Sequence, residues 1–329
     1  MRAIQICSET GPDDALELAE ISVPQASHMM TPGEGVLIDV EAAGVSFPEL
    51  LQTRGQYQFR PPLPFVPGSE VAGTVRAATG SSDLQPGERV VGFTMIGGWA
   101  EVALAPAFMS FRLPDQLDSV EGAGLLLNYL TALFCLRTRG RLTEGETVLV
   151  HGGAGGVGTA TLQVASGLGA TTIAVVSDQA KRQVAFEAGA DSVVLSSGPW
   201  KDEVLEISGG GVDLVIDPVG GDRFTDSLRA LGEGGRVVVV GFAAGSIPEV
   251  KVNRLLLKNT EVIGAGWGAW ALSKPGLNVA MGRELIGLIE NGQVKPLIGE
   301  RFEFGVAGAA AALRSIDERR AAGKLVLEL

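Results

Sequence analysis

From residue 147 onward, short apolar runs alternate with helix-compatible segments in a regular rhythm. Residues 147–150 are β-branched or apolar, as is typical of a buried strand. The same texture predicts strands at 147–151, 171–176, 192–195, 212–216, 236–240 and 261–263, with helices at 159–168, 179–188, 200–207 and 223–231. Such alternation predicts a parallel sheet with right-handed crossovers, and six strands match a doubly wound, dinucleotide-binding α/β fold.

The first 114 residues have a different texture, in which short strand-like runs are punctuated by Gly and Pro. This pattern predicts a compact, mainly antiparallel β domain with strands at 36–40, 71–75 and 89–93. A helical stretch follows at 120–136. After about residue 265 the alternation stops and the chain can return to the first domain, where 324–329 forms its last strand. The predicted domains are therefore residues 1–122, residues 123–264, and a return at 265–329.

A glycine-rich turn connects the first strand of the alternating region to its helix. Gly153, Gly155 and Gly158 form G-x-G-x-x-G, which a chain with 46 glycines can also contain by chance. The flanking strand and helix favour a dinucleotide site, because glycines allow a tight turn, close approach of a pyrophosphate, and close packing of helix on strand. The helix N-terminus offers N–H groups to the phosphates. The predicted cofactor contacts here are Ala154, Gly155, Gly156 and Val157.

The residues at the end of the second strand indicate which nicotinamide cofactor the chain binds, NADH or NADPH. An acid there would bind a ribose 2′-hydroxyl, but this chain has Val176, followed by Ser177 and then Lys181 and Arg182. A missing acid beside basic residues favours NADPH, with Ser177 and Lys181 as cofactor contacts. Two points leave the choice open: exposed basic side chains are commonly just solvated, and Asp178 opposes a phosphate if it faces one.

Composition narrows the class of protein further. The net charge is −12 with no basic run, which argues against nucleic acid as a partner. Two cysteines exclude a disulfide framework and suggest a reducing, cytoplasmic location. The longest apolar run, 122–136, is too short to span a membrane.

Several stretches together resemble one known family. They are Gly44-Val45-Ser46-Phe47, Pro67-Gly68-Ser69-Glu70-Val71-Ala72-Gly73, Pro86-Gly87-Glu88-Arg89-Val90, the glycine turn, and Asp217-Pro218-Val219-Gly220-Gly221. With them the chain resembles the zinc-independent quinone oxidoreductase (zeta-crystallin-like) branch of the medium-chain dehydrogenases/reductases. The resemblance implies a GroES-like, mainly antiparallel catalytic domain built from both chain ends, with a Rossmann domain inserted between them. It also implies a homodimer that pairs the last strands of two cofactor domains, at about 260–264.

The same resemblance implies a set of site residues. The cofactor contacts are extended by Phe242, Asn253, Gly266 and Lys324, and the catalytic candidates are Tyr57, Ser46 and Thr131. Many relatives carry asparagine where this chain has Ser46. Tyr57 is suited to donate a hydrogen bond to a carbonyl oxygen, and it is equally typical of an ordinary half-buried aromatic.

The resemblance also bears on metal. Zinc relatives place cysteine and histidine where this chain has Ser46 and Ser69, and His28 and His151 are its only histidines, so no zinc site is expected. Oxidation of an alcohol needs a group that stabilises an alkoxide. Reduction of a quinone or an enone needs less, because conjugation in the substrate delocalises the arriving charge.

The sequence therefore predicts an NADPH-dependent reductase that transfers a hydride, without metal, to a quinone or an α,β-unsaturated carbonyl. Two alternatives stay open: a reductase of enoyl thioesters, and a non-catalytic NADPH-binding protein.

Overall fold

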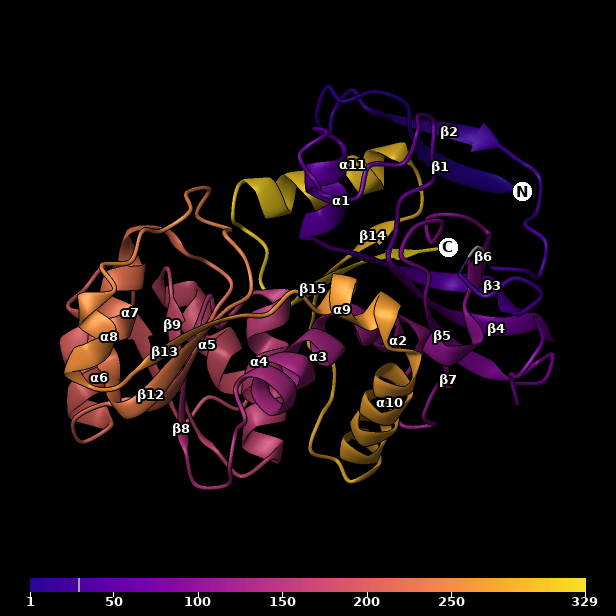
Figure 1. Ribbon diagram of the computed structural model, residues 1–329. Coiled ribbons are helices and arrows are strands. Elements are labelled where there is room, and N and C mark those ends of the chain that lie inside the picture. Colours follow the sequence, from indigo (N-terminus) through magenta and orange to yellow (C-terminus); the bar gives the residue numbers. More distant parts are fainter. Residues whose placement is uncertain (29) are drawn as a thin grey trace. The chain divides into compact units, whose positions relative to one another are not determined.

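The computed structural model describes residues 1–28 and 30–329, which divide into two compact units (Figure 1). Unit 1 comprises Met1–Leu127, Pro275–Ile286 and Lys295–Leu329, and unit 2 comprises Asn128–Lys274 and Gly287–Val294. Residues 265–274, which the sequence assigns to the return, belong to unit 2 in this division.

Unit 2 is built on a six-stranded parallel sheet. Its strands are β8 (Thr147–His151), β9 (Thr171–Val176), β10 (Ser192–Leu195), β11 (Val212–Asp217), β12 (Leu231–Val239) and β13 (Glu261–Gly264). They are ordered β10-β9-β8-β11-β12-β13, so the order reverses between β8 and β11. In a doubly wound sheet, ligands bind outside the carboxyl ends of the strands at such a reversal.

Helices cover both faces of this sheet. The helices that follow β8 in this unit are α4 (Gly156–Gly167), α5 (Gln179–Glu187), α6 (Trp200–Ile207), α7 (Phe224–Ala230), α8 (Asn253–Leu257) and α9 (Trp267–Ser273), with a short 3₁₀ turn η3 at Gly221–Arg223. Figure 1 shows α4 and α5 on one side of the strands and α6 and α7 on the other. The core beneath α6 and α7 is apolar, because Trp200, Val204 and Phe224 pack against inward-facing strand residues such as Leu149 and Val215.

Unit 1 is mainly antiparallel. Its strands are β1 (Arg2–Ile6), β2 (Leu16–Glu20), β3 (Gly35–Val45), β4 (Glu70–Thr79), β5 (Arg89–Phe93), β6 (Val102–Ala105), β7 (Ser110–Arg112), β14 (Ile298–Glu303) and β15 (Lys324–Glu328). Seven of these strands form one sheet in the order β14-β15-β3-β4-β5-β7, with β6 also paired to β3, while β1 and β2 pair with each other. The last strand, β15, thus lies beside β3 from the first part of the chain.

The helices of unit 1 are short, apart from one that covers its core. They are α1 (Phe47–Gln52), the 3₁₀ turn η1 (Ala107–Met109), α2 (Ser119–Gly122) and α11 (Val306–Asp317). Helix α11 buries Ala309, Ala312 and Leu313 in the same apolar core as Ile4 and Ile38. Helices α3 (Leu126–Leu133) and α10 (Pro275–Glu290) and the π-helical stretch η2 (Phe134–Arg139) complete the chain.

Two sequence expectations are wrong in detail. The helix predicted at 120–136 is broken between α2 and α3, where a Cβ on Gly124 would lie 3.0 Å from both Ile298 and Lys324. At this break the backbone forms i→i+3 hydrogen bonds, from Gly124 N to the carbonyl oxygen of Glu121 and from Leu125 N to the carbonyl oxygen of Gly122, which end the first helical turn. Strand β12 also begins at Leu231 instead of residue 236, because Leu231 pairs with Val212 and a register shift in the glycine-rich stretch precedes the regular pairing from Arg236.

No helix within the described part of the chain is both long enough and apolar enough to cross a membrane.

Candidate functional site

The glycine turn after β8 forms a cradle that only glycine permits. A Cβ on Gly158 would lie 2.1 Å from the carbonyl oxygen of Gly152, and one on Gly153 would lie 2.7 Å from the Cβ of Ala174. Gly155 is the N-cap of α4, and no side chain caps this helix end. The first N–H groups of α4 are therefore left for an external acceptor such as a phosphate. The turn fits the pyrophosphate of a dinucleotide.

The end of β9 carries the groups that face a ribose in this kind of fold. Ser177 donates from Oγ to Oδ2 of Asp178 at 2.7 Å, and Oδ1 of Asp178 accepts from the backbone N of Lys181 at 3.0 Å. The hydrogen bonds from Ser177 and from Lys181 hold the pKa of Asp178 below its usual value, so this carboxyl stays ionised. An anion thus stands between Ser177 and Lys181, the two residues predicted to contact a 2′-phosphate.

Other predicted cofactor contacts follow the carboxyl ends of further strands. Phe242 comes after β12 and packs on Gly220 in the turn after β11, where an added Cβ would lie 2.9 Å from its ring. Gly266 follows β13 as the N-cap of α9, and exposed Asn253 begins α8. Because the strands are parallel, their carboxyl ends lie at one edge of the sheet. This edge gathers Phe242 and Gly266 with the glycine turn.

Helix α3 approaches the same turn. A Cβ on Gly156 would lie 2.5 Å from Nδ2 of Asn128, which is 5% exposed. Thr131 is three residues further along and lies on the same face of the helix. Asn128 is a residue that the sequence reasoning missed, although an amide inside the apolar run 122–136 was a visible signal.

Two buried polar groups shape the ends of β8 and β11. His151 shares a hydrogen bond of 2.8 Å between its Nε2 and Oγ of Ser227, and burial lowers the pKa of His151, which keeps the ring neutral. Asp217 accepts from the backbone N of Val219 and of Gly220 at 2.8 and 2.9 Å, which closes the turn after β11. His151 thus joins the end of β8 to α7, and Asp217 stabilises the turn after β11.

Unit 1 contains a buried polar cluster, which we call the acid–lysine cluster: Ser46, Glu49, Ser69, Glu70 and Lys324. None of the five is more than 8% exposed. Strands β3, β4 and β15 and the start of α1 bring them together, because the register pairs Leu325 with Val45 and so sets Lys324 opposite Ser46, the N-cap of α1. Gly44 makes room for Glu70, since a Cβ there would lie 2.7 Å from the Glu70 Cγ.

The hydrogen bonds of the acid–lysine cluster are short and specific. Lys324 donates from Nζ to Oγ of Ser46 and to Oε1 of Glu70, each at 2.5 Å, and Oε2 of Glu70 accepts from the backbone N of Leu127 at 2.8 Å. Glu49 accepts from Oγ of Ser69 at 2.5 Å and from the backbone N of Ser46 at 2.9 Å. Burial raises the pKa of Glu49, which these hydrogen bonds and the Lys324 charge lower only in part.

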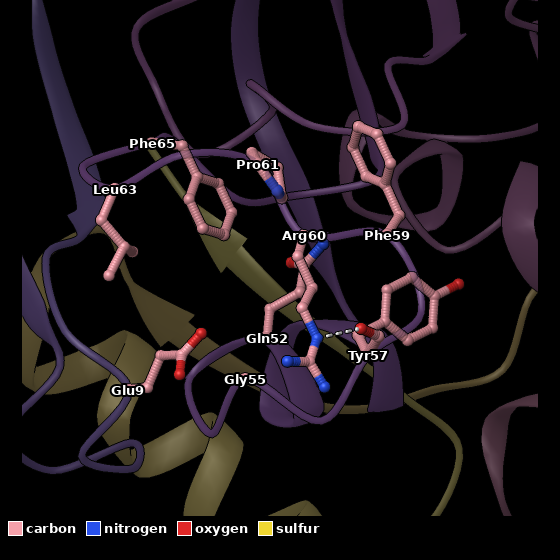
Figure 2. Close-up of a pocket in the computed structure, with 9 residues that line it drawn as sticks. All are labelled: Glu9, Gln52, Gly55, Tyr57, Phe59, Arg60, Pro61, Leu63 and Phe65. Carbon is pink, nitrogen blue, oxygen red and sulfur yellow. Dashed lines mark hydrogen bonds between the residues drawn. The ribbon is translucent and has the colours of Figure 1, made fainter.

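Tyr57 lies beside this cluster, close enough to feel the charge of Glu49, on a small open pocket. The pocket is lined by Glu9, Gln52, Gly55, Tyr57, Phe59, Arg60, Pro61, Leu63 and Phe65 (Figure 2). Arg60 donates from Nε to the carbonyl oxygen of Tyr57 at 3.2 Å, and Figure 2 shows the Tyr57 hydroxyl directed away from the other lining side chains. Burial, followed by the nearby charge of Glu49, raises the pKa of Tyr57, so its phenol keeps its proton.

Lys324, which the sequence predicts as a cofactor contact, is enclosed in unit 1, and its role toward the cofactor stays a prediction. The side chain is 4% exposed, and its ammonium is bound to Ser46 and Glu70 inside unit 1. The expectation came from the resemblance, which places a basic group of the returning tail near the cofactor. Pairing of β15 with β3 instead turns this lysine into the interior.

Comparison with known proteins identifies the family. The family model described as the alcohol dehydrogenase GroES-like domain matches residues 32–115, and the one described as zinc-binding dehydrogenase matches residues 156–279. Quinone oxidoreductase-like protein 2 of Bos taurus is 37% identical over 319 residues, which cover 94% of this chain and 91% of that protein. The chain belongs to the quinone oxidoreductase family of the medium-chain dehydrogenases/reductases.

Solved structures agree with this assignment. A probable oxidoreductase from Mycobacterium abscessus has a TM-score of 0.88 at 39% identity, covering 100% of this chain and 99% of that one. The quinone oxidoreductase from Thermus thermophilus, solved alone and in complex with NADPH, has a TM-score of 0.83 at 32% identity and covers 100% of both chains. The predicted fold class, a GroES-like domain combined with a Rossmann domain, is confirmed.

The residues present do not fit the zinc ion that one family description names. Serine hydroxyls stand at Ser46 and Ser69, where zinc prefers thiolate or imidazole, and an ammonium is already bound between Ser46 and Glu70. Over residues 1–28 and 30–329, no three His, Cys, Asp or Glu side chains gather to hold a metal.

Proposed function

We propose that the chain is an oxidoreductase that uses NADPH to reduce a quinone or an α,β-unsaturated carbonyl without a metal ion. The observation that carries the proposal is the uncapped N-terminus of α4 above a turn in which Gly158 touches Gly152. The complex of the Thermus thermophilus relative with NADPH supports the cofactor. Bound NADPH supplies the hydride, which the protein cannot supply itself.

The residues of the chain have four roles in this proposal. The N–H groups of Gly156 and Val157 bind the pyrophosphate. Lys181 binds the 2′-phosphate together with Ser177, whose hydroxyl turns to the phosphate from Asp178. Thr131 lies on the face of α3 toward the glycine turn and positions the nicotinamide end. The Tyr57 phenol keeps its proton and donates a hydrogen bond to the oxygen of the acceptor, where negative charge develops.

The direct test is turnover. NADPH is mixed with the protein and phenanthrenequinone, then with crotonyl-CoA, and the absorbance of the reduced nicotinamide is followed. A faster loss of this absorbance with the quinone than with crotonyl-CoA supports the proposal. Preferential loss with crotonyl-CoA would favour the enoyl thioester reductase, and tight NADPH binding without turnover of any acceptor would favour the non-catalytic binding protein.

The preference for NADPH is tested at Lys181. Lys181→Ala is expected to weaken the binding of NADPH about tenfold, which is about 1.4 kcal/mol, and to leave the binding of NADH almost unchanged. Arg182→Ala is the matched control, because the Arg182 guanidinium lies 5.9 Å from the centre of its own helix neighbour Phe186. Equal losses for both cofactors in Lys181→Ala would show that this lysine does not bind the 2′-phosphate.

We also propose a homodimer that pairs the β13 strands of two copies. β13 is an edge strand of the six-stranded sheet, with Val262 38% exposed. Leu256 and Leu257 of neighbouring α8 are 78% and 79% exposed, which is unusual for leucine on a monomer surface. Val262→Lys should shift sedimentation velocity from dimer to monomer, and an unchanged sedimentation coefficient would refute this interface.

The net charge and the two cysteines bear on the other partners of the chain and on its location in the cell. We propose that no nucleic acid or membrane takes part, because the net charge of −12 repels phosphate backbones and anionic lipid. The protein would reside in the cytoplasm, where its thiols at Cys7 and Cys135 stay reduced. Retention on a heparin column at physiological salt would contradict the first part of this proposal.

A further inference from the structure

The acid–lysine cluster of unit 1 contains one cation and two carboxyl groups away from solvent. Lys324 is 4% exposed and Glu70 is 1% exposed, and the atoms that pair are 2.5 Å apart. A charge taken so far out of water is tolerated only when a partner lies in contact with it. The buried Glu70 carboxylate therefore requires Lys324 as its partner, and Glu49 adds a second carboxyl group to the same cluster.

The ammonium of Lys324 binds as a small cation would. Its two acceptors are a carboxylate oxygen of Glu70 and the hydroxyl oxygen of Ser46, groups that also serve hard divalent cations. Ser69 and Glu49 add two further oxygen-bearing side chains to the cluster. All the side-chain acceptors are oxygens, so the set would suit Mn²⁺ or Mg²⁺ better than zinc.

We propose that Lys324 is a built-in cation that takes the electrostatic place of a metal ion in this unit. The ammonium neutralises Glu70, which in turn holds the start of α3 through the backbone N of Leu127. It also fixes the direction of the Ser46 hydroxyl. An ammonium can only donate, so Ser46 Oγ accepts from it and must direct its own proton to a different acceptor. Lys324 is thus a positioning residue that fixes Ser46 Oγ as the acceptor in this contact, so that the Ser46 proton points away from the ammonium.

The proposal predicts that removal of the lysine creates a metal site. Lys324→Ala in the full chain should bind Mn²⁺, measured by electron paramagnetic resonance, at least tenfold more tightly than the wild type. Lys324→Arg should keep the wild-type affinity because it restores the positive charge. The double variant Lys324→Ala/Glu70→Gln should lose the gained binding, because one of the two carboxylates is gone.

The matched control is Lys258→Ala. That lysine donates from Nζ to the carbonyl oxygen of Leu231 at 2.6 Å and has no carboxylate in that contact, so its removal should create no Mn²⁺ site. If Lys324→Ala unfolds in chelator, its recovery on addition of Mn²⁺ supports the proposal. The proposal is overturned if Mn²⁺ does not restore the folded variant. It is also overturned if folded Lys324→Ala binds Mn²⁺ no more tightly than the wild type does. The readout is metal binding, so it is independent of the proposed reductase activity.

Discussion

Replacement of Gly158 by alanine tests the cofactor site most directly. An added methyl group would lie 2.1 Å from the Gly152 carbonyl oxygen and 2.8 Å from the Gly153 Cα, both of which are backbone atoms. The first contact is about 1.3 Å short of ordinary van der Waals separation, so α4 must move away from the turn after β8. Overpacking of this kind costs about 1–3 kcal/mol of stability.

The same movement should weaken NADPH binding. A shift of about 1 Å takes the N–H groups of α4 out of hydrogen-bond distance from a phosphate held by the rest of the turn. We expect Gly158→Ala to raise the Kd for NADPH at least tenfold, or about 1.4 kcal/mol. Quenching of tryptophan fluorescence on titration with NADPH measures the Kd, and thermal unfolding measures the loss of stability.

Gly287→Ala is the matched control for this prediction. Gly287 lies within α10 and also belongs to unit 2, but an added Cβ there would meet no atom within 4 Å. This change should raise stability by up to about 1 kcal/mol, because alanine favours a helix over glycine, and should leave the Kd unchanged. The reasoning is refuted if Gly158→Ala binds NADPH as tightly as Gly287→Ala does.

Three further predictions concern single side chains. Burial raises the pKa of Glu49, so stability from its neutral form is fully present below the ordinary value of 4.5 and is lost as pH rises through the higher folded pKa. Glu49→Gln should therefore match the wild type in Tm at about pH 4 and exceed it increasingly toward pH 8; a constant difference contradicts this. Gln52→Leu should stabilise the chain by about 1 kcal/mol in chemical denaturation, because Oε1 of Gln52 is buried and has no partner in the described structure; a loss would show that the amide is satisfied. Arg236→Met should cost about 3–5 kcal/mol, because this buried guanidinium binds Glu146 at 2.7 and 2.8 Å, whereas the exposed Arg112→Met should change the midpoint little; equal effects would refute the role of burial.

Periodicity and turn chemistry were enough to predict the architecture of unit 2. Each parallel strand is a short apolar run, and helices α4 to α7 each lie between two strands, so the pattern along the chain predicts their order, whereas it missed α8 and α9. The glycine turn was also visible, because its spacing reflects local steric contacts such as that of Gly158 with Gly152. Ser177 and Lys181 could be placed near each other because both follow the same strand within one helical turn.

The tertiary structure decided everything that depends on distant pairs. Lys324 binds Ser46 and Glu70 across 278 and 254 positions, and no periodicity in the chain relates them. Their contact depends on the register of β15 against β3, which the packing of the whole sheet determines. The contact of Asn128 with Gly156 has the same origin, since a close approach of two segments leaves no mark in either segment alone. The sequence thus determined the elements and the local turn that suits a phosphate, and only the folded chain decided which polar groups share the interior of unit 1.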